Sequence, residues 1–197
     1  MVLKTREKLI EVARQLFAHK GIENTTMSDI ANASDRGRRT IYTYFKNKRE
    51  IYNAVIERES EHLVERLRGI ASSDISATEK LMMFIDVRLQ IVRETIDHQS
   101  DNPMLRTLFI REVKRMERIR NMAIEKELDL IQNILDEGLE SGEFSPETVD
   151  SVYMAMLMMF QGIELSYMRN NFHQMHIDAD KVPDQVKEFI LNAITNK

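Results

Sequence analysis

The chain has 197 residues, of which 43% are hydrophobic and 30% charged, a balance typical of a soluble globular protein. This composition excludes a disordered chain and a collagen-like fibre, and the lack of Cys excludes disulfides, thiolate zinc sites and a cysteine nucleophile. The N-terminus lacks an apolar secretory segment, and the longest apolar run, residues 154–160, is far below the ~20 residues that span a bilayer. We therefore expect a cytoplasmic protein with no membrane partner.

Charge is divided unevenly along the chain, although the formal net charge is only -4. Residues 1–50 contain 11 Lys and Arg against 6 Asp and Glu, a net of +5, whereas residues 51–197 contain 17 against 26, a net of -9. A basic quarter on an acidic body is typical of a protein in which one module binds a polyanion. Random scatter of the charged residues is the alternative explanation.

The first two predicted helices lie near the N-terminus. Apolar residues at helical spacing predict the first over residues 5–20, and Gly21 ends it. The second begins near Met27, because Thr26 followed three residues later by Asp29 is a capping-box pattern.

A third short helix is predicted over residues 38–45, after a break at residues 33–37 that contains turn-forming Ser, Asp and Gly. Ile41 and Phe45 lie one turn apart and are expected to face inward. Two short helices joined by a tight turn behind a longer helix indicate a helix-turn-helix, whose second short helix enters the DNA major groove. The residues left on the outer side of that helix are Arg38, Arg39, Thr40, Tyr42 and Thr43.

These outer side chains suit a DNA groove. Arg can donate to both O6 and N7 of guanine, Thr can contact a thymine methyl or a base edge, and a Tyr hydroxyl can reach a phosphate. A solvated, Arg-rich turn with no DNA role is the alternative.

Residues 26–55 resemble the DNA-binding signature of the tetracycline-repressor (TetR) family of bacterial transcription regulators. Three motifs carry this resemblance: Thr26 ahead of Asp29-Ile30-Ala31, the run Thr40-Ile41-Tyr42-Thr43-Tyr44-Phe45, and Lys46-Asn47-Lys48 at the start of a fourth helix. The resemblance implies a double-stranded DNA operator as partner and an interface made of Thr26, Arg36, Gly37, Arg38, Arg39, Thr40, Tyr42, Thr43, Tyr44, Lys46 and Lys48.

The resemblance also implies a role for most of these residues. Thr26 and Lys48 are expected to bind phosphates. Base edges should face Arg38, Arg39 and Thr43. The two tyrosines, Tyr42 and Tyr44, should lie against the DNA backbone.

The predicted turn departs from the family pattern, because Ser34-Asp35-Arg36-Gly37 replaces a small residue, Gly, an apolar residue and a capping Ser or Thr. Asp tolerates the left-handed backbone of a tight turn, and Gly is an acceptable N-cap, so we expect the motif to survive. Arg36 then either points outward or adds a third cation at the groove. The basic segment of residues 4–8 can reach a neighbouring phosphate or minor groove, or it is a frayed terminus.

The body is predicted to be helical throughout, for about nine helices in all: an all-α chain with a helix-turn-helix domain over residues 1–48 and an effector-binding and dimerisation domain over residues 49–197. Apolar periodicity predicts body helices over residues 48–70, 78–97, after Pro103, 119–142, 146–167 and from Pro183. The motif Ser145-Pro146-Glu147 predicts the start of the next-to-last helix. The resemblance implies a homodimer through the last two helices, and so an inverted-repeat operator.

Methionine clusters at residues 82–83 and 154–159 favour ordinary core, with an adaptable apolar ligand chamber as the alternative. Arg88 and Glu164 lie beside apolar residues and are expected to be exposed or paired with each other. The candidate chamber walls are Phe84, Arg88, Phe109, Met122, Met156, Phe160 and Glu164.

We therefore predict a homodimeric TetR-type repressor that is released from its operator by a small, largely apolar effector and needs no cofactor or metal. It is not predicted to be an enzyme, because no nucleophile elbow, phosphate loop or metalloprotease motif is present. Two alternatives remain open: control by a protein partner, and a helical metal enzyme using His173, His176 and the nearby acids. The basic stripe over residues 111–118 is expected to be a solvated face.

Overall fold

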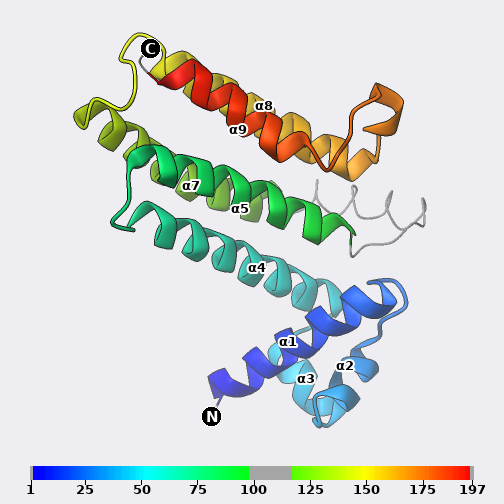
Figure 1. The fold of residues 1–197 in the computed structure, drawn as a ribbon. Coiled ribbons are helices and arrows are strands. Elements are labelled where there is room, and N and C mark those ends of the chain that lie inside the picture. Colours follow the sequence, from blue (N-terminus) through cyan, green and yellow to red (C-terminus); the bar gives the residue numbers. More distant parts are fainter. Residues whose placement is uncertain (1, 98–116, 196–197) are drawn as a thin grey trace. The chain divides into compact units, whose positions relative to one another are not determined.

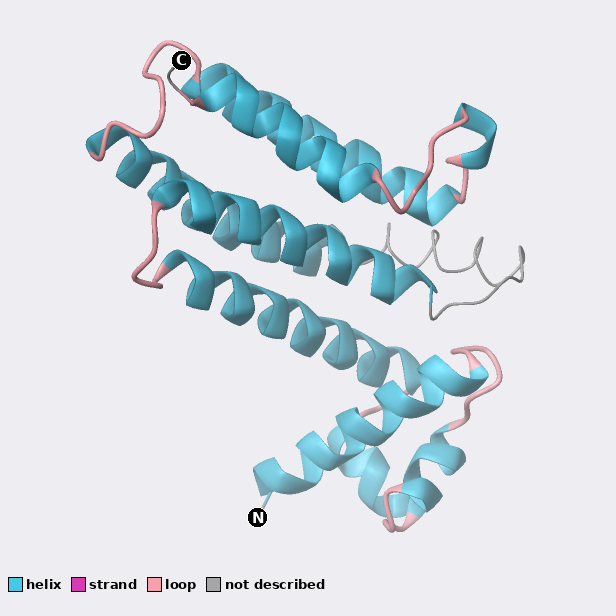
Figure 2. Cartoon of the chain, in the orientation of Figure 1, coloured by secondary structure: helices cyan, strands magenta, loops and turns pink. Residues whose placement is uncertain are grey.

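The computed structural model describes residues 2–97 and 117–195, and this part of the chain contains eight α-helices and one 3-10 helix (Figures 1 and 2). Apart from one antiparallel bridge between Phe144 and Thr195, no extended pairing occurs among these residues, so the predicted all-α fold is confirmed. None of the described helices is long and apolar enough to cross a membrane. The described residues form two compact units, residues 2–62 with 117–119 and residues 63–97 with 120–195.

The first unit consists of α1 (Val2–Lys20), α2 (Met27–Ala33), α3 (Arg38–Tyr44) and the first half of α4 (Lys48–Ala71). Their apolar faces meet in one buried cluster, as the helical spacing predicted. Its members are Leu9, Ile10, Ala13, Ile30, Ala31, Ile41, Phe45, Ile51, Ala54 and Val55.

A side-chain capping box defines the start of α2. The Thr26 hydroxyl accepts a hydrogen bond from the Asp29 N–H at 3.1 Å, and the Asp29 carboxylate accepts from the Thr26 N–H at 2.8 Å, which is the predicted capping box. After α2 the backbone of Asp35 turns left-handed, with φ of 54°, and Gly37 is the N-cap of α3. A non-glycine residue therefore holds the left-handed position of the turn, as expected for Asp.

The second unit contains the rest of α4 with α5 (Ala77–Asp97), α7 (Glu117–Glu140), α8 (Val149–Arg169), the 3-10 turn η1 (His173–Met175) and α9 (Val182–Ile194). Helix α5 packs against α8 and α9, which also pack against each other. The carboxylate of Glu143 accepts from the N–H groups of Ala77 and Thr78 at 3.1 and 2.9 Å, so a residue distant in sequence caps the first turn of α5.

Helix α8 starts later than predicted, at Val149 rather than Pro146. The Ser145 N–H donates to the Ile194 carbonyl at 2.8 Å, which holds this segment against the end of α9. Residues 146–148 then form a turn that follows Ser145. The Ser145 hydroxyl accepts a hydrogen bond from the Glu147 N–H at 3.3 Å. The predicted start was wrong because a tertiary contact, absent from the local pattern, decides where the backbone becomes helical.

The helix predicted after Pro103 lies outside the described residues, and so do the side chains of the basic stripe over residues 111–118. Of the methionine clusters, Met156 is buried, but Met83, Met154 and Met158 are 47%, 67% and 66% exposed. The prediction that both clusters are ordinary core was therefore wrong for these three residues. Local apolar content does not reveal which face of a helix another element covers.

Candidate nucleic-acid interface

Helix α3 is anchored by its apolar side and presents its polar side to solvent. Ile41 and Phe45 are 0% and 3% exposed, within the core of the first unit. Arg38, Arg39 and Tyr42 are exposed on the opposite side. The helix is therefore fixed in rotation, and its outer side chains can be presented to a groove without disturbing the core.

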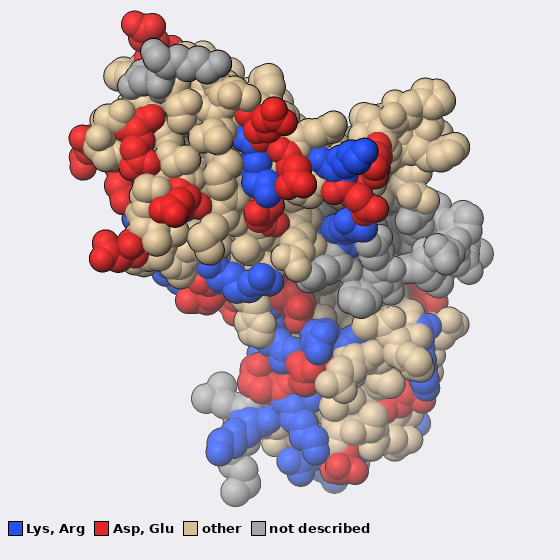
Figure 3. Space-filling model, viewed as in Figure 1, with Lys and Arg blue, Asp and Glu red and all other residues tan. Residues whose placement is uncertain are grey.

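The cations around α3 are available to a ligand. Arg36, Arg38 and Arg39 are all exposed, and within the described part of the chain none of their guanidinium groups pairs with a carboxylate. Figure 3 shows Lys and Arg side chains gathered on the first unit at the end where α1 begins. The exposure of Arg36 agrees with both expectations for this residue, an outward orientation and a third cation at the groove. An array of exposed, unpaired cations on a fixed helix can bind a polyanion.

The hydroxyl side chains of the predicted interface are partly engaged within the protein. Thr26 Oγ1 donates to the Asp29 carboxylate at 2.8 Å, and Thr43 Oγ1 donates to the Arg39 carbonyl at 3.1 Å. Each oxygen can still accept a hydrogen bond, and the Thr43 methyl remains a contact surface for thymine. Gly37 is exposed, and Thr40 is half-buried.

The remaining predicted contacts are of three kinds. Tyr44 is half-buried against the core of the first unit, whereas Lys46 is exposed. Lys48 donates from Nζ to the carbonyls of Ile22 and Glu23, at 2.6 and 3.3 Å. An ammonium has three donors, so one N–H of Lys48 is left for a phosphate while the other two hold α4 to the loop after α1.

An ion cluster between α1 and α4 was not predicted. Glu11 pairs with Arg14 at 2.8 Å and with Arg58 on α4, and Glu59 lies 3.7 Å from Arg14. Hydrogen bonding from Arg14, opposed by burial and reinforced by Arg58, lowers the pKa of Glu11 from 4.5 to about 2. The cluster ties α4 to α1 within the first unit.

Replacing Glu11 by Gln is expected to remove a pH-dependent part of the stability. Because the folded-state pKa of Glu11 is lowered to about 2 from 4.5, its ionised form favours folding above pH 4.5, and this contribution is lost as the pH falls from 4.5 toward 2. Urea unfolding of both proteins between pH 7 and 3 measures the effect. The stability difference should narrow below pH 4.5; a difference that is constant with pH would contradict the assignment, and the exposed Glu7→Gln variant is the control.

Arg88 in the second unit is buried and paired. Its Nε donates to Glu127 at 2.6 Å and its Nη2 to Glu164 at 3.2 Å, and the guanidinium lies 5.9 Å from the centroid of the Phe160 ring. Burial alone lowers the pKa of Arg88, but the two carboxylates outweigh it, so the pKa is raised. The pairing of Arg88 with Glu164 was one of the two expected outcomes.

The sequence did not lead us to predict that Glu127 is a buried partner of Arg88, although its position in the helix indicated it. It falls on the apolar stripe of α7, three residues after Ile124 and four before Ile131, where a carboxylate requires a buried partner. Phe84 and Met156 are fully buried in the same unit, and Phe160 is 6% exposed. The other two predicted chamber walls are not described: Phe109 lies outside the described residues, and so does the side chain of Met122.

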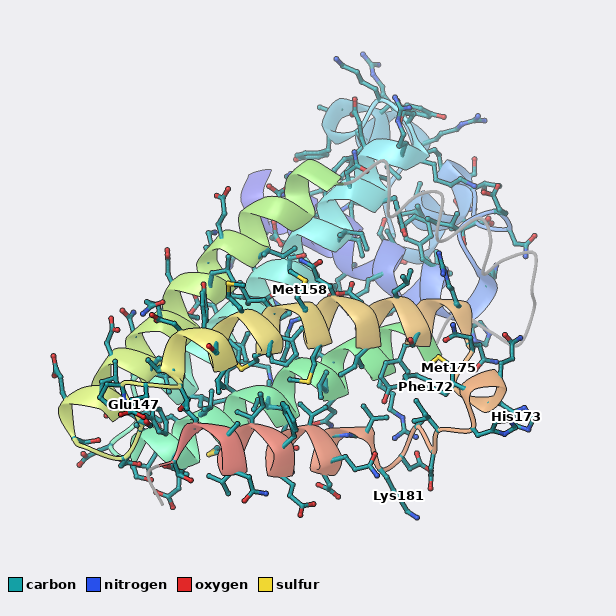
Figure 4. The ribbon with its side chains drawn as sticks, turned by 90° about the horizontal axis from the view of Figure 1, so that it is seen from above. Glu147, Met158, Phe172, His173, Met175 and Lys181 are labelled. Carbon is teal, nitrogen blue, oxygen red and sulfur yellow. The ribbon has the colours of Figure 1, made fainter. Side chains whose placement is uncertain are left out.

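The candidate metal ligands do not come together. His173 lies at the outer end of η1 in Figure 4, and His176 is also exposed. Asp178 pairs with Lys181 at 3.6 Å, and Asp180 pairs with Arg93 at 2.5 Å. Among the described residues, no group of three or more His, Asp or Glu is arranged to hold a metal ion.

The fold and the cationic array define a helix-turn-helix DNA-binding protein. Residues 9–55 match the family model for bacterial regulatory proteins of the tetR family. This part of the chain is therefore a DNA-binding domain of the TetR family of bacterial transcriptional regulators.

Known relatives cover nearly the whole chain. It is 26% identical over 190 residues to the fatty acid metabolism regulator protein of Bacillus subtilis (strain 168), covering 96% of this chain and 95% of that protein. The fold is similar to that of FadR from Bacillus subtilis in complex with stearoyl-CoA, with 21% identity, a TM-score of 0.62 and coverage of 95% and 98%. It is also similar to a putative transcriptional regulator from Saccharomonospora viridis in complex with choline, with 18% identity, a TM-score of 0.71 and coverage of 98% and 99%.

Proposed function

We propose that the protein is a homodimeric repressor that binds an inverted-repeat operator and is released from it by a fatty acyl-CoA. The observation that carries the DNA-binding part is the set of exposed cations on and before α3, Arg36, Arg38 and Arg39, which have no carboxylate partner in the described part of the chain. Arg38 and Arg39 read guanine edges, while Lys46, Lys48 and Thr26 hold phosphates. The protein acts through binding and not through catalysis.

A homodimer is supported by apolar side chains exposed on the last two helices. On α8, Met154, Met158 and Leu165 are 67%, 66% and 38% exposed and share one side by their spacing; on α9, Phe189 is 57% exposed (Figure 4 labels Met158). Exposed apolar patches of this kind mark interaction sites. A second copy is the partner we propose, since two-fold symmetry matches an inverted-repeat operator.

Met158→Glu is expected to convert the dimer to monomers, because it buries a charge in the proposed interface. Light scattering during size-exclusion chromatography measures the mass. Met83→Glu places the same charge at an exposed methionine of α5 and should leave the dimer intact. A dimeric Met158→Glu protein, or a monomeric wild type, would contradict the proposed interface.

The acyl-CoA part of the proposal is supported by relatives. The fatty acid metabolism regulator of Bacillus subtilis is similar to this chain over nearly its full length, and a similar fold holds stearoyl-CoA. The second unit offers buried apolar side chains suited to an acyl chain, among them Phe84, Met156 and Phe160.

Operator release tests the complete proposal. Selection from random duplexes should yield an inverted repeat, and the complex with it is then titrated with stearoyl-CoA, free CoA, stearate and choline. We expect stearoyl-CoA to release the DNA at concentrations where free CoA does not. Release by choline alone would show that the effector is not an acyl-CoA. Release by none of the four compounds would favour control by a protein partner.

A further inference from the structure

The N-terminal turns of α1 are held against the helix-turn-helix at two points. Lys8 Nζ lies 3.4 Å from the Asp35 carboxylate, in the turn between α2 and α3. The Arg6 guanidinium lies 5.5 Å from the centroid of the Phe45 ring, at the C-cap of α3. This segment is therefore helical and fixed beside both ends of α3, in contrast to the frayed terminus that was one of the two expectations.

The position of Asp35 places this ion pair on the DNA side of the first unit. Recognition helices approach the groove with their N-terminal residues, and Asp35 comes three residues before Arg38, the first residue of α3. Lys4 lies one helical turn from Lys8 and shares its face of α1. Both lysines therefore border the surface that carries the exposed cations of α3.

The ion pair between Lys8 and Asp35 is also easily broken. The side chains of Lys8 and Asp35 are 45% and 89% exposed, and ion pairs so open to water are weak. Duplex DNA carries one negative charge per ~1.7 Å of its axis, so a phosphate brought near this turn competes with Asp35 for the Lys8 ammonium.

We propose that Lys4 and Lys8 form a second phosphate-binding element of the DNA interface, and that Asp35 restrains it by pairing with Lys8 in the free protein. The ligand is the sugar-phosphate backbone of duplex DNA, and no base is read. When the duplex binds, Lys8 exchanges Asp35 for a phosphate, so Asp35 lowers the affinity for every DNA sequence. This inference rests on the proposed operator binding by α3.

The salt dependence of DNA binding by the full chain tests the element. Lys8→Ala and Lys4→Ala should each reduce the slope of log K against log [KCl] by about 0.9, the value of one phosphate contact, which is a change of about 3.5-fold between 50 and 200 mM. The selected operator and an unrelated duplex should be weakened by the same factor. Lys8→Arg should keep the slope, and Lys20→Ala, at the exposed end of α1, is the matched control.

The restraint by Asp35 is tested by a double-mutant cycle. Asp35→Asn should raise the affinity for both duplexes several-fold, whereas Glu57→Gln, an equal change of charge on an exposed residue of α4, should not. The gain should shrink in the Lys8→Ala background, because Asp35 acts through Lys8. An equal gain in both backgrounds would overturn this role of Asp35.

Failure of this inference is distinguishable from failure of the proposed function. If the wild-type protein binds its selected operator while Lys4→Ala and Lys8→Ala keep the wild-type affinity and slope, only the second element is refuted. If the wild-type protein selects no sequence from random duplexes, operator binding by α3 is refuted as well.

Discussion

Replacing Arg38 and Arg39 together by Ala is expected to abolish sequence-specific DNA binding. A bidentate arginine–guanine pair discriminates by about 1–3 kcal/mol, so the loss of two such pairs costs about 2–6 kcal/mol of specific affinity. Both side chains are exposed on α3, and within the described residues neither pairs with a carboxylate, so the fold should be unaffected. Affinity for unrelated DNA should fall much less, because the phosphate contacts remain.

Fluorescence anisotropy with the selected operator and an unrelated duplex measures this effect. Arg66→Ala is the matched control, since Arg66 is an exposed arginine of α4 in the second unit. Circular dichroism verifies that each variant is folded. The assignment of base reading to α3 is wrong if the double variant keeps both its affinity and its sequence preference.

Replacing Gly138 by Ala is expected to destabilise the second unit strongly. A Cβ atom at Gly138 would lie 2.0 Å from Cδ2 of Phe144, and Phe144 is 1% exposed. The backbone of Phe144 is held close to Gly138, because the Phe144 N–H donates to the Gly138 carbonyl at 3.0 Å. Overpacking of this kind costs about 1–3 kcal/mol or more, although Ala is the better helix former.

Gly69→Ala is the matched control for this prediction. Gly69 is also within a helix, α4, in the second unit, but a Cβ atom there would meet nothing within 4 Å. Since helical Gly costs roughly 0.5–1 kcal/mol relative to Ala, this variant should be slightly more stable than the wild type. Thermal unfolding measures the stability of both glycine variants relative to the wild type. The loss of stability caused by Gly138→Ala should be smaller in a Phe144→Ala background. Equal stability of Gly138→Ala and the wild type would show that the Phe144 ring can move aside.

The helix-turn-helix part of the protein was predictable because its signals are local. The capping box of Thr26 and Asp29 and the inward spacing of Ile41 and Phe45 each act within a few residues, so the order of α1 to α3 and the starts of α2 and α3 follow from the sequence alone. The same local pattern identifies the exposed side of α3 and, through it, the family.

Contacts between distant residues were decided only by the tertiary structure. The pairs Lys8–Asp35 and Arg88–Glu127 are separated by 27 and 39 residues, and no periodicity in one segment indicates which charged residue of another segment it will meet. The start of α8 was also decided by the tertiary structure, since Ser145 is held by the last turn of α9.

The sequence by itself therefore determined the all-α class, the helix-turn-helix and the basic character of the first 50 residues, because each depends on neighbours along the chain. Only the tertiary structure decided which of these cations are paired. Lys8 and Lys48 are engaged by partners within the first unit, whereas Arg36, Arg38 and Arg39 have no carboxylate partner among the described residues. The reason is physical: an ion pair or a close contact depends on distances in space, and those are set by how the helices pack.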